Sequence, residues 1–269
     1  MSPTDSPVPD RPCADPRFAR TELLLGWNGM ERLRQAHVLV VGLGAVGSYA
    51  VEGLARAGVG RLRIADFDIL RPSNMNRQLY ALDSTLGRAK TDVAEARIHD
   101  IHPNCRVEVH RVFADAATLP ALLEGPPDVV IDAIDSVSSK ILLLAAAVRS
   151  GAFVVSSMGA ATRTDPLQIR TGDLKNTNAC PLARRVRKRL RLQGISEGIR
   201  CVYSLEPANT AGRSGPRDWS EEDLMQRGRP RAPLGSLSVL TGMFGLIAAS
   251  EAIRYLTRDT PPNGAAEQD

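Results

Sequence analysis

The chain has 269 residues, of which 43% are hydrophobic and 24% are charged, enough for one α/β domain with its own core. Lys and Arg outnumber Asp and Glu by 34 to 30, an excess that permits a polyanionic partner without requiring one. The four cysteines form no C-x-x-C pair. This spacing argues against a structural zinc site and against a disulfide framework, and it favours the reducing cytoplasm.

Both ends of the chain and one apolar segment differ in composition from the rest of the sequence. Residues 1–16 are rich in Pro, Asp and Ser and lack the apolar core of a signal peptide, so we expect a disordered tail and no secretion. Residues 258–269 are expected to form a second flexible tail. Residues 232–250 carry no charge, and 19 residues is close to the length that spans a bilayer. We expect a buried helix at 237–256 instead, because this stretch is rich in Gly, Ser and Thr; membrane association is disfavoured but stays open.

Strand and helix patterns alternate through the first 158 residues. Apolar runs predict strands and longer periodic segments predict helices in this order: strand 37–41, helix 45–58, strand 62–66, helix 86–102, strand 105–109, strand 128–134, helix 138–150 and strand 152–157. Such alternation predicts an α/β fold with a doubly wound, mostly parallel sheet. We therefore assign residues 17–158 to a nucleotide-binding core.

The remainder, residues 159–257, is predicted to be a C-terminal extension of the same fold. It contains a short LQIR run, a basic helix at 182–192 and a short strand in the sequence CVYSL. Residues 207–233 are dominated by Pro, Gly, Arg and Ser, which predicts a mobile crossover loop. The apolar helix at 237–256 then closes the fold.

A glycine-rich turn follows the first predicted strand. Gly42, Gly44 and Gly47 form a G-x-G-x-x-G pattern at the start of a helix, where glycines permit a tight turn and close approach of phosphate. Asp66 lies 19 residues beyond Gly47, at the end of the second strand, from which a carboxylate can bind a ribose. Together with Ala45, these residues predict an adenine-nucleotide site without separating NAD from ATP.

Polar residues beyond Asp66 favour ATP. Asp68, Asn74 and Arg77 follow the second strand directly, and Lys90 begins the next helix. A carboxylate that attacks the α-phosphate of ATP builds negative charge, which Arg and Lys can stabilise. The fourth strand ends at Asp132-Ala-Ile-Asp135-Ser136, and magnesium is the natural partner for an acid there. We predict Arg77, Lys90 and Asp135 as catalytic residues; an NAD dehydrogenase is disfavoured because no hydride-handling His or Tyr cluster is evident.

These motifs carry a family resemblance. GLGAVGS, D-x-D-x(5)-N-x-x-R-Q, G-x-A-K and D-A-I-D-S resemble the Rossmann-like adenylation core of ubiquitin-activating-type enzymes over residues 17–157. The resemblance implies that Asp66 holds the ribose, that Arg77 and Lys90 contact phosphates, and that Asp135 binds magnesium. Arg17-Phe-Ala-Arg20 is similar to the R-[FY]-x-R element of the family. It implies a homodimer in which Arg20 reaches into the partner's nucleotide site.

Within this superfamily the chain is most similar to the tRNA threonylcarbamoyladenosine dehydratase branch. The two C-x-x-C pairs usual in sulfur-carrier adenylyltransferases are absent, while D-P-L-Q-I, C-V-Y-S-L-E and a G-S before the last helix resemble the dehydratases. The resemblance implies an ATP-dependent ligase that adenylates the threonyl carboxylate of threonylcarbamoyladenosine, beside the anticodon of tRNA, and cyclises it with release of AMP. It implies ATP and magnesium but no zinc.

Other functions stay open from the sequence. One is an adenylyltransferase that activates the C-terminal glycine of a ubiquitin-like sulfur carrier; another is a nucleotide-binding adaptor that has lost its chemistry. A cysteine desulfurase or a sulfur-acceptor protein as partner is also left open. Cys201 lies in an apolar run and is expected to be buried and inert, so direct attack on the adenylate is favoured over a thioester step.

The predicted basic helix offers a candidate tRNA-binding surface. Six positive charges fall within eight residues: Arg184, Arg185, Arg187, Lys188, Arg189 and Arg191. Such a run forms either a solvated helix face or a surface for the phosphates of tRNA. No aromatic residues are interleaved, so sequence-specific stacking on bases is not indicated.

Overall fold

A seven-stranded sheet organises the chain, and the computed structural model describes residues 15–209 and 234–258. The strand order is β3-β2-β1-β4-β5-β7-β6, and all neighbouring pairs are parallel except β6 and β7. The strands are β1 (His37–Val41), β2 (Arg61–Ala65), β3 (Arg106–His110), β4 (Val129–Asp132), β5 (Phe153–Ser157), β6 (Ile169–Asp173) and β7 (Ile199–Ser204). The predicted doubly wound, mostly parallel sheet is confirmed.

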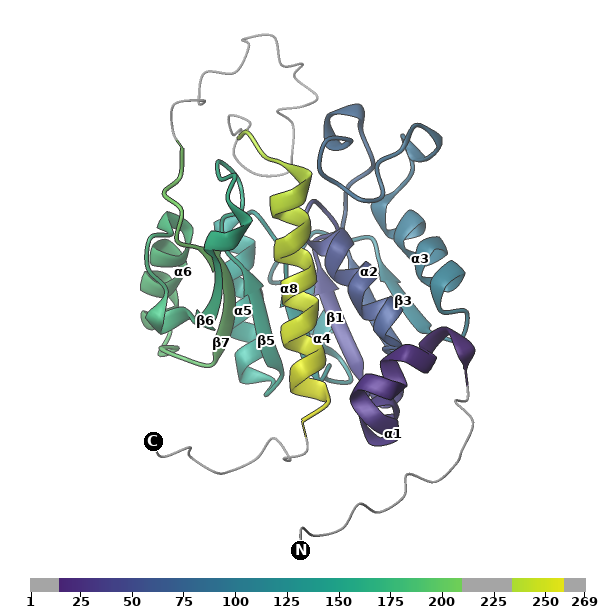
Figure 1. Ribbon diagram of the computed structural model, residues 1–269. Helices are drawn as coiled ribbons and strands as arrows, with labels where there is room; N and C mark the ends of the chain where they lie inside the picture. Colours follow the sequence, from purple (N-terminus) through teal and green to yellow (C-terminus); the bar gives the residue numbers. More distant parts are fainter. Residues whose placement is uncertain (1–14, 210–233, 259–269) are drawn as a thin grey trace, which may run out of the picture.

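Helices cover both faces of this sheet (Figure 1). On one face lie α1 (Ala19–Gln35), α2 (Gly47–Ala57), α3 (Lys90–Ile101) and α8 (Ser238–Leu256). On the other lie α4 (Leu119–Leu123), α5 (Val137–Arg149) and α6 (Pro181–Arg191). Short 3₁₀ turns are η1 (Pro16–Phe18), η2 (Pro72–Asn74), η3 (Asp83–Thr85), η4 (Pro166–Gln168) and η5 (Leu174–Asn176). The sequence analysis did not predict α1, in which Gly26 has φ +70° and interrupts the helical periodicity, nor did it predict the short helix α4.

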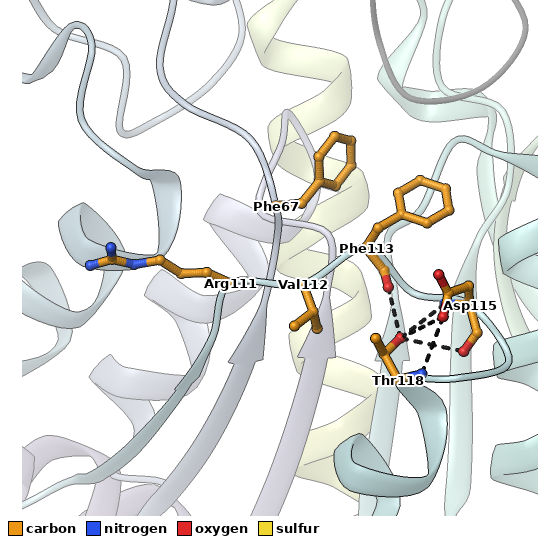
Figure 2. Close-up of a pocket in the computed structure, with 6 residues that line it drawn as sticks. All are labelled: Phe67, Arg111, Val112, Phe113, Asp115 and Thr118. Carbon is orange, nitrogen blue, oxygen red and sulfur yellow. Dashed lines mark hydrogen bonds between the residues drawn. The ribbon is translucent and has the colours of Figure 1, made fainter.

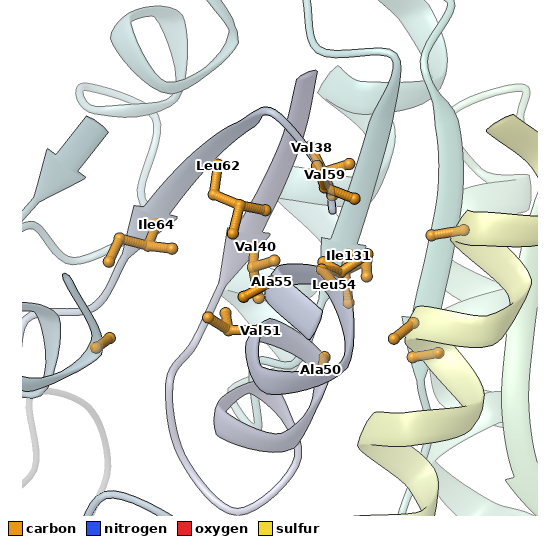
Figure 3. Close-up of a cluster of buried hydrophobic side chains, with 14 of the residues drawn as sticks. Val38, Val40, Ala50, Val51, Leu54, Ala55, Val59, Leu62, Ile64 and Ile131 are labelled. Atoms are coloured by element: carbon orange, nitrogen blue, oxygen red, sulfur yellow. The ribbon is translucent and has the colours of Figure 1, made fainter. Parts of the chain in front are cut away.

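The central strands β1, β4 and β5 are almost wholly buried, because helices cover both faces of the sheet. In β1, Val38 and Val40 point into the core under α2 and α8, whereas Leu39 and Val41 point into the core under α5. Figure 3 shows the first of these two cores. Successive side chains of a strand alternate between faces, so a sheet covered on both sides requires a continuous hydrophobic run.

The predicted apolar helix is α8, and it packs closely on α2. A Cβ added to Gly245 would lie 2.2 Å from the carbonyl oxygen of Val46 and 2.8 Å from Tyr49 Cβ. The glycines of α8 therefore permit a helix contact that a larger residue would prevent. Glu251 is buried and accepts a hydrogen bond of 2.7 Å from Nε of Arg200 on β7, which ties the helix to the sheet.

By length and hydropathy, α8 is the one helix among the described residues that could span a bilayer, and half of its most apolar window is buried inside the protein. Most of the predicted crossover loop (210–233) and of both predicted tails (1–14 and 259–269) lies outside the described residues. Asp15 and Pro16, which we assigned to the disordered tail, are ordered. The Asp15 carboxylate accepts a 3.0 Å bond from the amide of Arg17 and caps η1.

Candidate functional site: a nucleotide site at the carboxyl edge of the sheet

The glycine turn joins β1 to α2, and each of its three glycines is needed for a different structural reason. Gly42 has φ +92°, and a Cβ there would lie 2.8 Å from the carbonyl oxygen of Ala133. A Cβ on Gly47 would lie 1.7 Å from the carbonyl oxygen of Gly42. A Cβ on Gly44 would meet only Nε2 of Gln78, at 3.8 Å. Gly42 and Gly47 are thus required by the protein itself, whereas the space above Gly44 is open to a ligand.

Backbone amides at this turn are available for an anion. Among the described residues, none accepts a hydrogen bond from the amides of residues 44–47. Unpaired amides at the start of a helix carry partial positive charge and bind phosphate groups. The turn can therefore hold the phosphate of a nucleotide, as its sequence predicts.

Asp66 is fixed against the same turn. Its Oδ2 accepts a hydrogen bond of 2.6 Å from the amide of Leu43, and its Oδ1 accepts one of 2.9 Å from the amide of Asp68. A carboxylate oxygen can accept more than one hydrogen bond, so capacity remains for the hydroxyls of a ribose. The geometry is consistent with the predicted role of Asp66.

Lys90 is the first residue of α3 and is 5% exposed. Its Nζ lies 2.8 Å from Oδ2 of Asp68, and the Asp68 carbonyl oxygen accepts the Lys90 amide at 3.1 Å. Asp68 therefore positions Lys90, and its predicted role as a nucleotide ligand stays a prediction. Asn74 is also turned inward: its Oδ1 accepts the amide of Arg71 at 3.1 Å and closes η2.

Arg77 and Asp135 come from opposite sides of the site. Arg77 is half-buried, and its Nη1 donates to the carbonyl oxygen of Ser73 and to Oδ1 of Asn76, both at 2.8 Å. Burial lowers the pKa of Arg77, and the negative charge of Asp135 opposes this effect. Asp135 is exposed in the turn between β4 and α5. The two predicted catalytic residues thus interact electrostatically across the carboxyl edge of the sheet.

A buried ion pair beneath Asp135 was not predicted. Asp132 and Lys140 are both fully buried, and Oδ2 of Asp132 lies 2.5 Å from Nζ of Lys140. Ser156 Oγ donates to the same carboxylate oxygen at 2.6 Å, and Oδ1 of Asp132 accepts the amide of Ile134 at 3.1 Å. The pair holds the turn that carries Asp135. The one sign of this pair in the sequence is Lys140, a charged residue within the mostly apolar helix α5.

A cavity of about 430 Å³ is lined by residues that follow β2 and β3 (Figure 2). Phe67 and Phe113 form part of its wall, with ring centroids 5.1 Å apart in an edge-to-face arrangement. The other lining residues are Arg111, Val112, Asp115 and Thr118. The segment after β3 has no functional signature in the sequence, because its partner Phe67 is distant in the chain.

Arg20 lies far from the nucleotide turn of its own chain. It is exposed and follows Phe18, whose ring packs beside Gly58 at the C-terminal end of α2. The glycine turn is at the other end of this helix, about 16 Å away for 11 residues. Arg20 can therefore serve a nucleotide site only in another copy of the chain. Leu23 and Leu24 on the same helix are 88% and 82% exposed.

The predicted basic helix is α6, and it is amphipathic. Ala183, Val186 and Leu190 are buried, while the exposed cations are Arg184, Arg185, Lys188, Arg189 and Arg191. Arg187, which was predicted to belong to the same surface, has partners within the protein. It is half-buried, and its Nη1 donates to the carbonyl oxygens of Leu174 and Thr177 at 3.1 and 2.7 Å. This arginine stabilises the loop before α6 because it faces the protein.

Cys201 is fully buried, and burial raises the pKa of its thiol. A thiolate is the nucleophilic form, so the structure confirms the expected buried, unreactive environment.

A doubly wound sheet with a glycine turn, an acid after β2 and basic residues at its carboxyl edge defines a Rossmann-like nucleotide-binding protein. The chain belongs to the ThiF family, which matches residues 18–268. It is 36% identical to the tRNA threonylcarbamoyladenosine dehydratase of Bacillus subtilis over 243 residues, which cover 90% of this chain and 95% of the relative.

The same similarity extends to solved structures. The crystal structure of the Escherichia coli tRNA N6-threonylcarbamoyladenosine dehydratase in complex with ATP has a TM-score of 0.79 and 34% identity. The match covers 89% of this chain and 93% of that one. By contrast, the molybdopterin-synthase adenylyltransferase of Escherichia coli is 37% identical over only 124 residues, 45% of this chain and 49% of the relative.

Replacing Lys140 by Met should destabilise the protein by about 3–5 kcal/mol, because the substitution leaves the Asp132 carboxylate buried and uncompensated. Chemical denaturation of the single variant measures this loss. The double variant Asp132→Asn/Lys140→Met removes both charges and should recover much of the stability. Equal stability of the wild type and the Lys140→Met variant would contradict the importance of the ion pair.

Proposed function

We propose that this chain is an ATP-dependent enzyme that dehydrates and cyclises threonylcarbamoyladenosine beside the anticodon of tRNA. The observation that carries the proposal is a full-length similarity to tRNA threonylcarbamoyladenosine dehydratases, combined with Arg77, Lys90 and Asp135 at a nucleotide turn. The partial match to the molybdopterin-synthase enzyme makes sulfur-carrier adenylation the weaker alternative. A tRNA substrate places the enzyme in the cytoplasm.

The chemistry requires two steps at one site. The threonyl carboxylate attacks the α-phosphorus of ATP, the bond to the β-phosphate oxygen breaks, and pyrophosphate leaves. The carbamoyl group then attacks the activated carboxyl carbon and loses a proton as AMP departs with the former carboxylate oxygen. Both steps develop negative charge on phosphate oxygens, which preorganised cations stabilise. The decisive test is mass spectrometry of tRNA nucleosides before and after incubation with ATP.

The residues of the site have distinct roles in this scheme. The amides of the glycine turn bind phosphate and Asp66 binds the ribose, while the cavity lined by Phe67 and Phe113 suits the adenine base. Arg77 and Lys90 stabilise the charge that develops at the α-phosphate. Among the described residues no group of three or more His, Cys, Asp or Glu side chains could hold a metal. Asp135 with phosphate oxygens suits magnesium, which commonly binds one or two carboxylates plus substrate phosphates.

Arg77→Ala and Lys90→Gln should each lower the rate of AMP formation in the presence of tRNA by roughly a hundredfold, because each removes a positive charge from the α-phosphate. Steady-state turnover measures the effect, and thermal melting checks that each variant is folded. Arg149→Ala, an exposed arginine at the far end of α5, is the control and should retain wild-type turnover. Unchanged turnover of a folded Arg77 variant would reject its catalytic role.

We further propose that the enzyme is a homodimer in which Arg20 completes the partner's site. Arg20 cannot reach its own glycine turn, and the exposed Leu23 and Leu24 of α1 form an apolar surface that a second copy would bury.

Complementation tests the shared site directly. Arg20→Ala and Lys90→Gln homodimers should each be nearly inactive, but a mixed dimer contains one site with an intact Arg20 and an intact Lys90. Mixing the two variants under exchange conditions should therefore restore part of the activity. A monomeric mass by light scattering at micromolar protein, with full activity, would contradict the proposal.

We also propose that the exposed cations of α6 bind the tRNA backbone. The face that carries them is opposite the buried Ala183, Val186 and Leu190, so all five exposed cations can meet phosphates together. Each phosphate contact releases counterions, which makes affinity fall with salt.

Replacing Arg185, Lys188 and Arg189 by Gln should weaken tRNA binding at moderate salt. It should also flatten the slope of log affinity against log salt by about one unit for each lost contact. A filter-binding series over salt concentration measures both. The charge-matched control is Arg106, Arg149 and Arg254 to Gln, which lie on other elements and are all exposed. If both triple variants behave alike, net charge rather than α6 explains the binding.

A further inference from the structure

Among the described residues, the side chain of Gln78 has no hydrogen-bond partner. Gln78 is 8% exposed, and its Oε1 is buried without a partner; no other described residue bonds to its Nε2. Its backbone, in contrast, is held by hydrogen bonds to Asn74 (2.9 Å) and Ala81 (3.1 Å). An unpaired buried amide is costly, and nearly all such groups in proteins find a partner. Nε2 is not among the buried unpaired atoms, so it is the atom of this carboxamide that a ligand can reach.

This carboxamide faces the open side of the glycine turn. In the part of the chain that the structure describes, and apart from the neighbours of Gly44 in sequence, its Nε2 is the only atom within 4 Å of a Cβ placed on Gly44, and the amides of residues 44–47 have no partner there either. Ser48 fixes the arrangement: its Oγ donates to the Gly44 carbonyl oxygen at 2.7 Å and accepts the amide of Leu79 at 3.3 Å. The turn and the segment with Gln78 are thus joined, so the orientation of Gln78 is built into the fold.

We propose that Gln78 is a nucleotide-binding residue, in which Nε2 donates a hydrogen bond to an oxygen of the α-phosphate. The ribose acid Asp66 is bonded to the amide of Leu43, next to Gly44, so the phosphate that follows the ribose lies over Gly44. An amide side chain can present either its nitrogen or its oxygen by a 180° rotation, and the nitrogen suits an anion.

The inference rests on the proposed use of ATP and adds a residue that acts throughout the reaction. ATP, the acyl adenylate and AMP all contain adenosine, and the α-phosphate is the one phosphate group that all three share. A donor to that group should therefore contribute similarly to the binding of ATP and AMP and nothing to the binding of adenosine. This pattern distinguishes Gln78 from groups that hold the β- and γ-phosphates and from a residue that only supports the fold.

The test compares Gln78→Met and Gln78→Glu with the wild type. Met keeps the volume but removes the donor, and Glu adds a negative charge beside the phosphate. Calorimetry should show that Met weakens ATP and AMP binding by a similar factor of about ten, since a hydrogen bond to a charged group is lost. The loss with Glu should be larger. Adenosine affinity, measured by competition, should not change in the Met variant, and the exposed Gln193→Met is the control for the substitution.

Unchanged AMP and ATP affinity in a folded Gln78→Met variant would overturn the inference, as would an equal loss for adenosine. These outcomes are separable from failure of the proposed function. If the wild type binds AMP and ATP but leaves threonylcarbamoyladenosine in tRNA unchanged, the substrate assignment fails while Gln78 retains its role. If the wild type converts tRNA and the Met variant binds AMP normally, only the role of Gln78 fails.

Discussion

The close approach of α2 to the end of β1 is the constraint on which the rest of the structure depends. A Cβ on Gly47 would lie 1.7 Å from the Gly42 carbonyl oxygen, so the helix can start at this point only without a side chain there. The same helix is then clamped from outside by α8 through Gly245. Two small-residue contacts therefore place the N-terminus of α2, with its unpaired amides, at the carboxyl edge of the sheet. Every proposed nucleotide contact is arranged around that point.

Charge at this edge is organised in two layers. The Asp132–Lys140 pair is fully buried and is hydrogen-bonded to residues of β5 beneath the site. It therefore holds the strands and the turn of the site in position. The Asp68–Lys90 pair is nearer the surface and places one ammonium where phosphate is expected. Arg77 and Asp135 lie further out, and the negative charge of Asp135 counteracts the lowering of the Arg77 pKa by burial. A bound nucleotide would meet the outer layer while the inner one keeps its position.

Much of this arrangement follows from local sequence. The strand runs, the glycine turn, the acid after β2 and the polar segment around Arg77 each have a local signature, because the burial of strands and the conformation of glycine depend on near neighbours. The same holds for α6, whose charges and apolar positions alternate with helical spacing. Helix α1 was missed because Gly26 and exposed leucines break that spacing, and its position depends on contacts with distant α8.

What the sequence by itself determined is the class of fold, the glycine turn with Asp66 and the identity of the polar groups that follow it. Only the tertiary structure decided how those groups are used. Asp68 serves Lys90, Arg187 faces its own loop, Asp132 pairs with Lys140, and Gln78 is turned toward Gly44 without a partner. Residue type and spacing are local properties, whereas the direction of a side chain depends on packing between segments far apart in the chain. For that reason a motif can name the polar residues of a site but cannot separate those that face the ligand from those that hold them in place.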